Sequence, residues 1–195
     1  YDGVGAYNND GTLKAGAKVL YITAKTAKTV STTVNTGKSE TITGLQSIID
    51  AYSKGKDKTP IAFRIIGKVS LSDLDHISSS AEGLQVKGAT MNMTFEGVGD
   101  DATVYGFGFL LREAVSVEFR NFAIMRCLDD AMSLDTKNSH VWIHNMDLFY
   151  GKKGSAADQA KGDGTVDIKG DSKYVTVAYN RFWDNGKASM CGMKS

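Results

Sequence analysis

Proline is nearly absent from this 195-residue chain, which has a single one, Pro60, beside 21 glycines. That balance argues against collagen-like repeats and against disordered low-complexity sequence. No apolar run approaches the roughly 18 residues of a membrane-spanning helix. Net charge is also missing, because 23 basic residues nearly cancel 22 acidic ones. We therefore expect no general attraction for nucleic acid or membranes, and any charged partner must be held by a local cluster.

Cysteine is equally scarce. Cys127 and Cys191 are the only two, and neither belongs to a metal-type C-x-x-C motif. We expect both to be small buried apolar residues rather than a disulfide, because nothing else indicates a stapled scaffold. The first ten residues, YDGVGAYNND, lack the basic start and apolar stretch of a signal peptide. If the protein is secreted, we expect that peptide to have been removed.

What the chain does contain is a repeat. Three segments share one pattern: LLREAVSVEFRNFAI from Leu110, LDTKNSHVWIHNMDL from Leu134 and IKGDSKYVTVAYNRF from Ile168. In each, the first apolar residue is followed seven positions later by a valine (Val117, Val141 or Val175) that opens an alternating strand. Val86 and Met93 show the same step one unit earlier.

The repeat length predicts the fold. Met93, Val117 and Val141 follow one another at 24 residues, whereas Val141 and Val175 lie 34 apart. The longer step contains GKKGSAADQAKGDG, which we interpret as an insertion of about ten residues looped out of one unit. Short strands and a period too short for a βαβ unit favour a parallel β-helix, a solenoid of stacked coils. An antiparallel sandwich would instead show hairpin turns every 8 to 12 residues.

The N-terminal part has a different character. Lys18 to Thr23 predicts a strand, and the polar stretch at 24–40 predicts a loop. Leu45, Ile48, Ile49 and Tyr52 then form one face of a helix that ends near Gly55. We expect this helix to cap the open end of the solenoid. The prediction is one domain over 1–195, with strand, loop and cap at 1–60 and coils at 61–195.

Acidic residues gather in the repeats. Asp163 and Asp167 lie four residues apart in GDGTVDIKG, and a bend at Gly164, helped by Gly162, would let their carboxylates converge. Asp130 precedes Leu134 by four residues and Asp163 precedes Ile168 by five, so both fall at the same corner of successive coils, about 4.8 Å apart. We predict that Asp130, Asp163 and Asp167 surround one site. Oxygen ligands without histidine or cysteine select a hard cation, and a flexible carboxylate set suits Ca²⁺ better than Mg²⁺.

Two lysines flank that corner, Lys169 two residues after Asp167 and Lys187 in FWDNGK. Lysines beside a cation are suited to bind an anionic polymer. His140 and His144 have no partner at zinc-site spacing. Trp142 alternates with Val141 and Ile143, so it is expected to face outward, and stacking on a sugar or on Thr176 of the next coil both stay open.

At these residues the chain resembles a pectate lyase of the family-1 polysaccharide lyases, a group of right-handed parallel β-helices. Three segments carry the resemblance: VWI at 141–143 for the family's V-W-I-D-H, DGTVDIKGDSKYVTVAYNRF at 163–182 for D-G-x-x-D-I-K-x-x-S-x-Y-V-T-V-S-x-N-x-F, and FWDNGK at 182–187 for F-x-x-H-D-K. With the weaker GLQVKG and MNMTFEGVG segments, the resemblance extends from about Lys18 to the end. It departs at His144–Asn145 and at Asn185–Gly186.

The resemblance implies a function. Asp163, Asp167 and Asp130 match the family's calcium ligands, and Lys187 and Lys169 match substrate-binding lysines. The implied activity is secreted, calcium-dependent β-elimination of polygalacturonate (pectate), which leaves an unsaturated sugar end. The family's base is an arginine in R-x-P-R, a context that no arginine here has. We expect that residue beyond Ser195, in a remaining C-terminal part of the same protein or a second chain.

Three alternatives stay open from the sequence. A pectin lyase would act on methylated substrate without calcium, and would not need the acidic trio. A β-helix glycoside hydrolase would use acids such as Asp129 and Asp130 as general acid and base. A catalytically silent β-helix would bind acidic polysaccharide through Ca²⁺ and Lys187.

Overall fold

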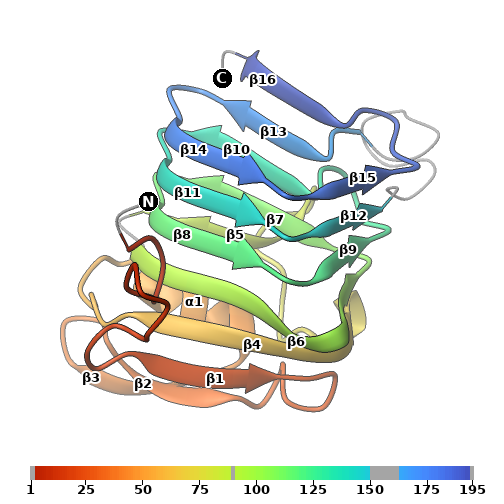
Figure 1. The fold of residues 1–195 in the computed structure, drawn as a ribbon. Coiled ribbons are helices and arrows are strands. Elements are labelled where there is room, and N and C mark those ends of the chain that lie inside the picture. Colours follow the sequence, from red (N-terminus) through yellow and green to blue (C-terminus); the bar gives the residue numbers. More distant parts are fainter. Residues whose placement is uncertain (1–2, 89–90, 150–162, 194–195) are drawn as a thin grey trace.

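The structure, a computed structural model, describes residues 3–88, 91–149 and 163–193. Its strands wind into a column of stacked coils, seen from the side in Figure 1. A nine-stranded sheet contains β1 (Lys18–Ile22), β4 (Ile61–Ser70), β6 (Met91–Tyr105), β8 (Val115–Arg120), β11 (Ser139–His144), β14 (Lys173–Ala178), β9 (Ala123–Met125), β12 (Asp147–Phe149) and β15 (Arg181–Trp183). A five-stranded sheet contains β5 (Gly83–Lys87), β7 (Gly108–Arg112), β10 (Met132–Thr136), β13 (Val166–Lys169) and β16 (Ser189–Met193). All pairings in both sheets are parallel, so the predicted β-solenoid is confirmed.

The coils stack in the predicted register. Met93, Val117, Val141 and Val175 occupy one position on β6, β8, β11 and β14. The longer step between Val141 and Val175 therefore leaves the strands in line, although most of its insertion, at 151–162, lies outside the described residues.

One part of the repeat pattern was wrong. Leu111, not Leu110, pairs with Val86 and Leu134. The register shifts between Leu134 and Thr136, which places one extra residue in β10. The step from Leu134 to Val141 is therefore longer by one residue than the step from Leu111 to Val117. Leu111 accordingly lies in the core, whereas Leu110 faces a surface groove.

Aromatic stacking fills the interior of the column. Phe63, Phe95 and Phe119 lie in register on three successive coils, with ring centroids 5.1 Å apart at both steps. Phe109 from the opposite sheet packs at 5.0 Å against two of these rings. Offset stacks of this kind add to the gain from burying the rings, so each coil fixes the height of the next.

Both cysteines are free thiols, as expected, but only Cys127 is buried. The prediction of burial was wrong for Cys191, because β16 is the edge strand of the five-stranded sheet.

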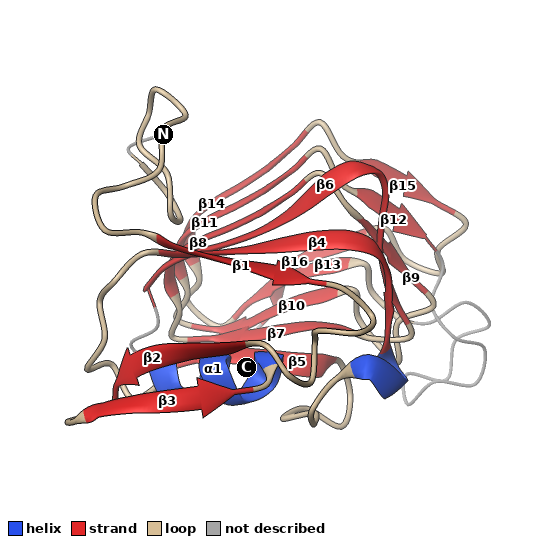
Figure 2. Ribbon diagram, turned by 90° about the horizontal axis from the view of Figure 1, so that it is seen from below, coloured by secondary structure: helices blue, strands red, loops and turns tan. Residues whose placement is uncertain are grey.

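The helix α1 (Leu45–Tyr52) covers the other edge of that sheet. Its face of Leu45, Ile48, Ile49 and Tyr52 is buried, as predicted. The buried Gln46 side chain takes the place of a further strand, because its amide donates to the Gln85 carbonyl at 3.0 Å and accepts from the Gln85 backbone N–H at 2.9 Å. Figure 2 shows α1 lying against β5 and against a two-stranded hairpin.

That hairpin, β2 (Ser31–Asn35) with β3 (Ser39–Thr43), corrects the loop predicted for 24–40. Its polar residues point to solvent, and the buried Val34 and partly buried Ile42 pack against the core. A short 3₁₀ turn (Leu71–Asp73) follows β4.

An N-terminal segment, residues 3–17, lies on the outer face of the nine-stranded sheet, as Figure 2 shows. The Tyr7 hydroxyl donates to Glu96 at 2.5 Å, and Glu96 also accepts from Arg64 at 2.8 Å and Arg120 at 2.7 Å. A Cβ at Gly5 would lie 2.2 Å from the Thr94 hydroxyl, so only glycine permits this approach.

Candidate functional site

Three acidic side chains meet at one corner of two adjacent coils. Carboxylate oxygens of Asp129, Asp130 and Asp163 lie within 4.8 Å of one another. Asp129 and Asp130 lie just before β10, separated from it by Ala131, and Asp163 lies shortly before β13, so parallel stacking brings these acids together. Asp130 is almost fully buried, and its Oδ1 accepts the Gly164 backbone N–H at 3.0 Å.

Asp167 lies on β13 beside this group and is completely buried. Neither of its carboxylate oxygens has a hydrogen bond among the described residues. Lys169 Nζ lies 3.3 Å from Asp167 Oδ2, an ion-pair contact that lacks hydrogen-bond geometry, and 3.3 Å from Asp130 Oδ2. One ammonium thus bridges the two acids, and it also donates to the Ser133 hydroxyl at 3.2 Å.

Gly164 makes room for Asp167. A Cβ there would lie 2.3 Å from Asp167 Oδ1, so no larger residue fits without displacing the carboxylate. The chain bends at Asp163 and Thr165, on either side of Gly164, as expected, and the glycine also permits this close approach. Gly162, to which the same role was given, lies outside the described residues.

The cluster is electrostatically costly as it stands. Burial raises the pKa of Asp129 to about 6, with Asp130, Glu82 and Asp163 adding to the effect. Burial also raises the pKa of Asp167, again with repulsion from Asp130. Asp130 and Asp167 raise the pKa of Lys169 against the opposing effect of burial, so this lysine is held in its charged form.

Lys187 reaches the same corner from the next coil. Its ammonium pairs with Asp163 Oδ1, and this hydrogen bond raises the pKa of the lysine. Both predicted lysines therefore contact predicted acids, and together the residues connect the coils of β10, β13 and β16.

A groove of about 330 Å³ runs from Lys169 across the outer face of the five-stranded sheet. Ser133, Gln85 and Arg112 are among its lining residues, and Arg112 donates to Asp135 at 2.6 Å. Among the arginines of the chain, Arg112 alone lies on a strand of this sheet. Leu110, not Arg112, occupies the register position between Gln85 and Ser133, so the polar groups of successive coils border the groove at different positions along the strands.

Two acids of this site were not among the predicted ligands. Asp129 was considered only as a catalytic acid, yet it lies in the carboxylate group, where its Oδ1 is buried without a hydrogen-bond partner among the described residues. Glu82 is buried, and burial together with Asp130 raises its pKa. The sequence signal for Glu82 was its position directly before β5, since Asp130 and Asp163 also precede strands of this sheet.

The donor set fits a divalent cation. Several buried or partly buried carboxylates share one corner, oxygens of Asp129 and Asp167 lack hydrogen bonds among the described residues, and all candidate ligands are oxygens. Such a set suits Ca²⁺ or another hard cation, and not zinc. The histidines belong elsewhere: His144 lies on the outer face of β11, 3.0 Å from Glu118, and the Trp142 ring stacks on it at 3.8 Å.

Comparison with known proteins places the chain. A family model described as pectate lyase matches residues 5–195. A pectate trisaccharide-lyase of Bacillus licheniformis is 24% identical over 159 residues, which cover 80% of this chain and 44% of that protein. Pectate lyase A of Emericella nidulans is 33% identical over 106 residues, covering 52% of this chain and 31% of that protein.

Solved structures share the fold. The pectate lyase Bsp165PelA from Bacillus sp. N165, solved in complex with trigalacturonate, superposes with a TM-score of 0.61 at 23% identity over 94% of this chain and 53% of that one. The thermostable pectate lyase PL 47 gives 0.55 at 19% identity, over 84% and 52%. The chain spans about half the length of these relatives. Because the family model covers nearly all of it, the chain belongs to the pectate lyase family.

Proposed function

We propose that this protein is a calcium-dependent pectate lyase that cleaves polygalacturonate by β-elimination and works outside the cell. The observation that carries the proposal is the buried carboxylate cluster with two lysines at the head of the groove on the five-stranded sheet. Membership of the pectate lyase family supports it. Within the described residues, no helix is long and apolar enough to cross a membrane.

Asp129, Asp130, Asp163 and Asp167 would hold the calcium ion. When bound, Ca²⁺ would neutralise a galacturonate carboxylate and so make the proton on the adjacent C5 carbon more acidic. Asp129 extends the predicted trio to four carboxylates, within the six to eight oxygen ligands that Ca²⁺ takes.

Lys187 and Lys169 would bind carboxylates of the polymer. Lys187 pairs with Asp163, and Lys169 pairs with Asp130. The carboxylates that would bind the cation therefore also hold the two lysines in position. Ser133, Gln85 and Arg112 would continue the contact along the groove.

The base that removes the C5 proton would come from outside this chain. Lys169 is unsuited to the task because its neighbours raise its pKa and keep it protonated. We propose that this base is an arginine, as the resemblance to the pectate lyases implies. The base takes the proton, the electron pair forms the C4–C5 double bond, and the glycosidic oxygen leaves from C4.

An inverting hydrolase is less well supported. Inverting hydrolases separate their two carboxyl groups by about 6.5–9.5 Å to admit water. The acids at this corner lie within 4.8 Å of one another, a spacing suited to sharing a cation.

The test uses the protein extended past Ser195 and its Asp163→Asn variant. With polygalacturonate and Ca²⁺, the wild-type protein should release products that absorb in the ultraviolet, and a chelator or Asp163→Asn should abolish the signal. New reducing ends without that absorbance would indicate a hydrolase. Calcium-dependent binding of oligogalacturonate without turnover would indicate a silent binding protein.

A further inference from the structure

A second concave site lies on the other sheet. A cavity of about 540 Å³ is lined by the bent strand β6 and by the turns that join β8 to β9, β11 to β12 and β14 to β15. It shares no lining residue with the acidic cluster or with the groove of the five-stranded sheet. We propose that this cavity binds a neutral sugar unit of a polysaccharide.

The turn positions in three coils carry the first observation. Asn121, Asn145 and Tyr179 each follow the last residue of strands that pair in register, and all have left-handed backbones, with φ of 61°, 52° and 56°. Asparagine tolerates this conformation, whereas a bulky residue adopts it at a cost. Tyr179 nevertheless stands where the other two coils have asparagine, with 85% of its surface exposed at the rim of the cavity.

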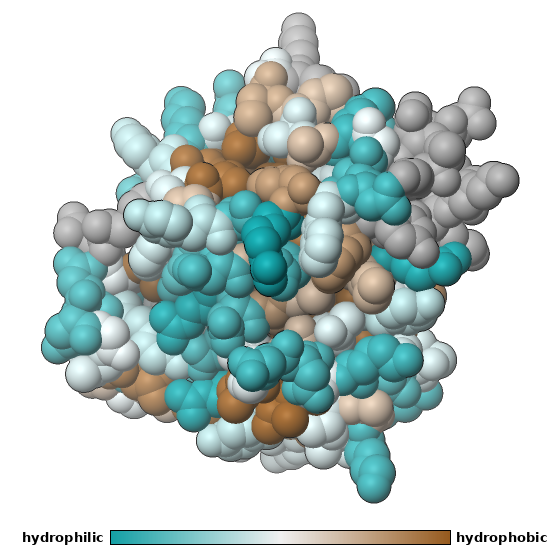
Figure 3. Space-filling view, turned by 45° about the vertical axis from the view of Figure 1, so that its right-hand side comes forward, coloured by the Kyte–Doolittle hydropathy of each residue, from teal (hydrophilic) through white to brown (hydrophobic). Residues whose placement is uncertain are grey.

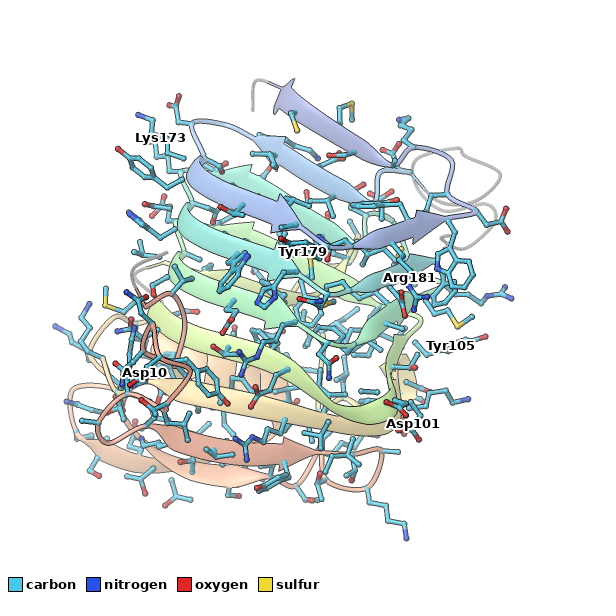
Figure 4. All side chains as sticks on the ribbon, in the orientation of Figure 1. Asp10, Asp101, Tyr105, Lys173, Tyr179 and Arg181 are labelled. Atoms are coloured by element: carbon cyan, nitrogen blue, oxygen red, sulfur yellow. The ribbon has the colours of Figure 1, made fainter. Side chains whose placement is uncertain are left out.

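The exposure of Tyr179 is shared by Tyr174 and Trp183 on the same coil, whose strands β14 and β15 lie at the edge of the sheet. Unlike Tyr174, however, Tyr179 lines the cavity, so its aromatic ring is a candidate for ligand contact. In Figure 4, Tyr179 lies near the middle of the view, and Arg181 lies to its right, above Tyr105 and Asp101. Figure 3 turns this side forward and shows hydrophilic and hydrophobic residues interspersed on it.

Contacts hold three lining residues, Asp147, Phe149 and Arg181, in place. Arg181 donates to both oxygens of Asp147, at 2.5 and 2.7 Å, and its guanidinium lies 5.7 Å from the Trp183 ring centroid. Trp183 in turn stacks on Phe149 at 4.4 Å. The two-point ion pair and the stacked rings hold these side chains in one orientation, so little freedom would be lost on binding.

The lining chemistry selects the ligand. Carboxylates of Asp100 and Asp147 accept hydrogen bonds from hydroxyl groups, the amides of Asn121 and Asn145 can donate and accept, and an aromatic ring offers a flat apolar face. Hydroxyls around a ring with an apolar face describe a sugar. The volume is also within the roughly 300–1,000 Å³ of small-ligand pockets.

Charge decides between neutral and acidic sugars. Arg181 is paired with Asp147, which leaves Asp100 uncompensated among the lining residues, and Asp101 follows it directly. A polymer of carboxylates would be repelled here. The occupant is therefore an uncharged sugar unit, unlike the acidic substrate proposed for the groove.

The test titrates the protein with cellotetraose and β-1,4-galactotetraose, with trigalacturonate as the acidic counterpart, by isothermal calorimetry in the presence of a chelator. Tyr179→Asn restores the residue type of the neighbouring coils, and Tyr174→Asn is the matched control, another exposed tyrosine with φ of 53° that does not line the cavity. Unfolding temperatures of both variants establish that they are folded.

We expect at least one neutral probe to bind, with about tenfold or greater loss of affinity in Tyr179→Asn and no change in Tyr174→Asn. The proposal is overturned if neither neutral probe binds at millimolar concentration, if Tyr179→Asn binds as well as wild type, or if trigalacturonate binds with the same dependence on Tyr179. Calcium binding that Asp100→Asn removes would also overturn it, because the cavity would then be a cation site. Lyase activity does not enter any of these outcomes.

Discussion

Replacing Asp167 by asparagine should stabilise the metal-free protein and abolish its stabilisation by calcium. The two effects have opposite signs because the carboxylate is buried without a hydrogen bond, among other acids. A residue of purely structural importance would lower stability in both conditions.

The magnitude follows from the charges around Asp167. Two carboxylates about 5 Å apart in general repel each other by about 3 kcal/mol at an effective dielectric constant of 20. Asp130 and Asp163 both repel Asp167. Lys169, at 3.3 Å, attracts the Asp167 carboxylate by about 5 kcal/mol at the same dielectric constant. When Asp167 is replaced by the neutral asparagine, Lys169 still pairs with Asp130. The balance favours the amide by about 1–2 kcal/mol, or about 2–8 °C in unfolding temperature for a chain of this size.

Calcium should act in the other direction on the wild-type protein. At a free concentration 100 times the dissociation constant, binding adds about 2.7 kcal/mol, which corresponds to about 5–10 °C. Asp167→Asn should lose this increment because one ligand is gone.

Differential scanning calorimetry with chelator and with calcium checks both effects. Asp171→Asn is the control, since Asp171 is an exposed acid on the next turn whose φ of 62° suits asparagine, and it should change neither value. A lower unfolding temperature of Asp167→Asn in chelator, or an undiminished calcium shift, would refute the reasoning.

Three further predictions address other parts of the molecule. Gly164→Ala should weaken calcium binding by about tenfold or more in calorimetric titration, because its Cβ would lie 2.3 Å from Asp167 Oδ1; unchanged affinity would show that the carboxylate is free to move. Gln46→Ala should lower the free energy of unfolding in urea by about 2–4 kcal/mol, because it removes two hydrogen bonds and leaves the backbone of Gln85 unpaired and buried. A loss within about 0.5 kcal/mol would contradict the conclusion that the Gln46 side chain takes the place of a strand beside β5. Burial alone would raise the pKa of Glu96, but hydrogen bonds from Tyr7, Arg64 and Arg120 lower it below the ordinary 4.5, so the ionised carboxylate stabilises the fold above that pH and this stabilisation is lost as the pH falls through the lowered pKa. Glu96→Gln should therefore lose less stability than wild type on acidification, measured by urea unfolding across acidic pH. Equal losses in the two proteins would count against the pairing.

The coil register could be predicted because stacking imposes it on the sequence. Valines at Val117 and Val141 face the same interior, so their spacing reports the repeat directly. The corner shared by Asp130 and Asp163 followed from that spacing. Local irregularities could not be obtained in this way. The register shift after Leu134 adds one residue to β10, which changes the number of residues to the next strand by one without altering the apolar pattern.

Contacts between distant segments also escaped prediction. The β2–β3 hairpin is polar on its exposed side, and the burial of Val34 depends on α1, which follows it in sequence. Asp129 looks like any turn aspartate until the neighbouring coil places Asp163 against it. That Lys169 bridges two acids depends on side-chain direction across coils, which periodicity alone does not specify.

The acidic cluster spans the coils that contain β10 and β13, and Lys187 adds the coil of β16. In a solenoid each coil contacts only its neighbours, so local opening can begin at an edge and proceed one coil at a time. An ion held between Asp130 and Asp163 would make the two coils open together or not at all. Amide hydrogens of β10 and β13 should then exchange as one cooperative unit, which would couple ligand occupancy to the order in which the column unravels.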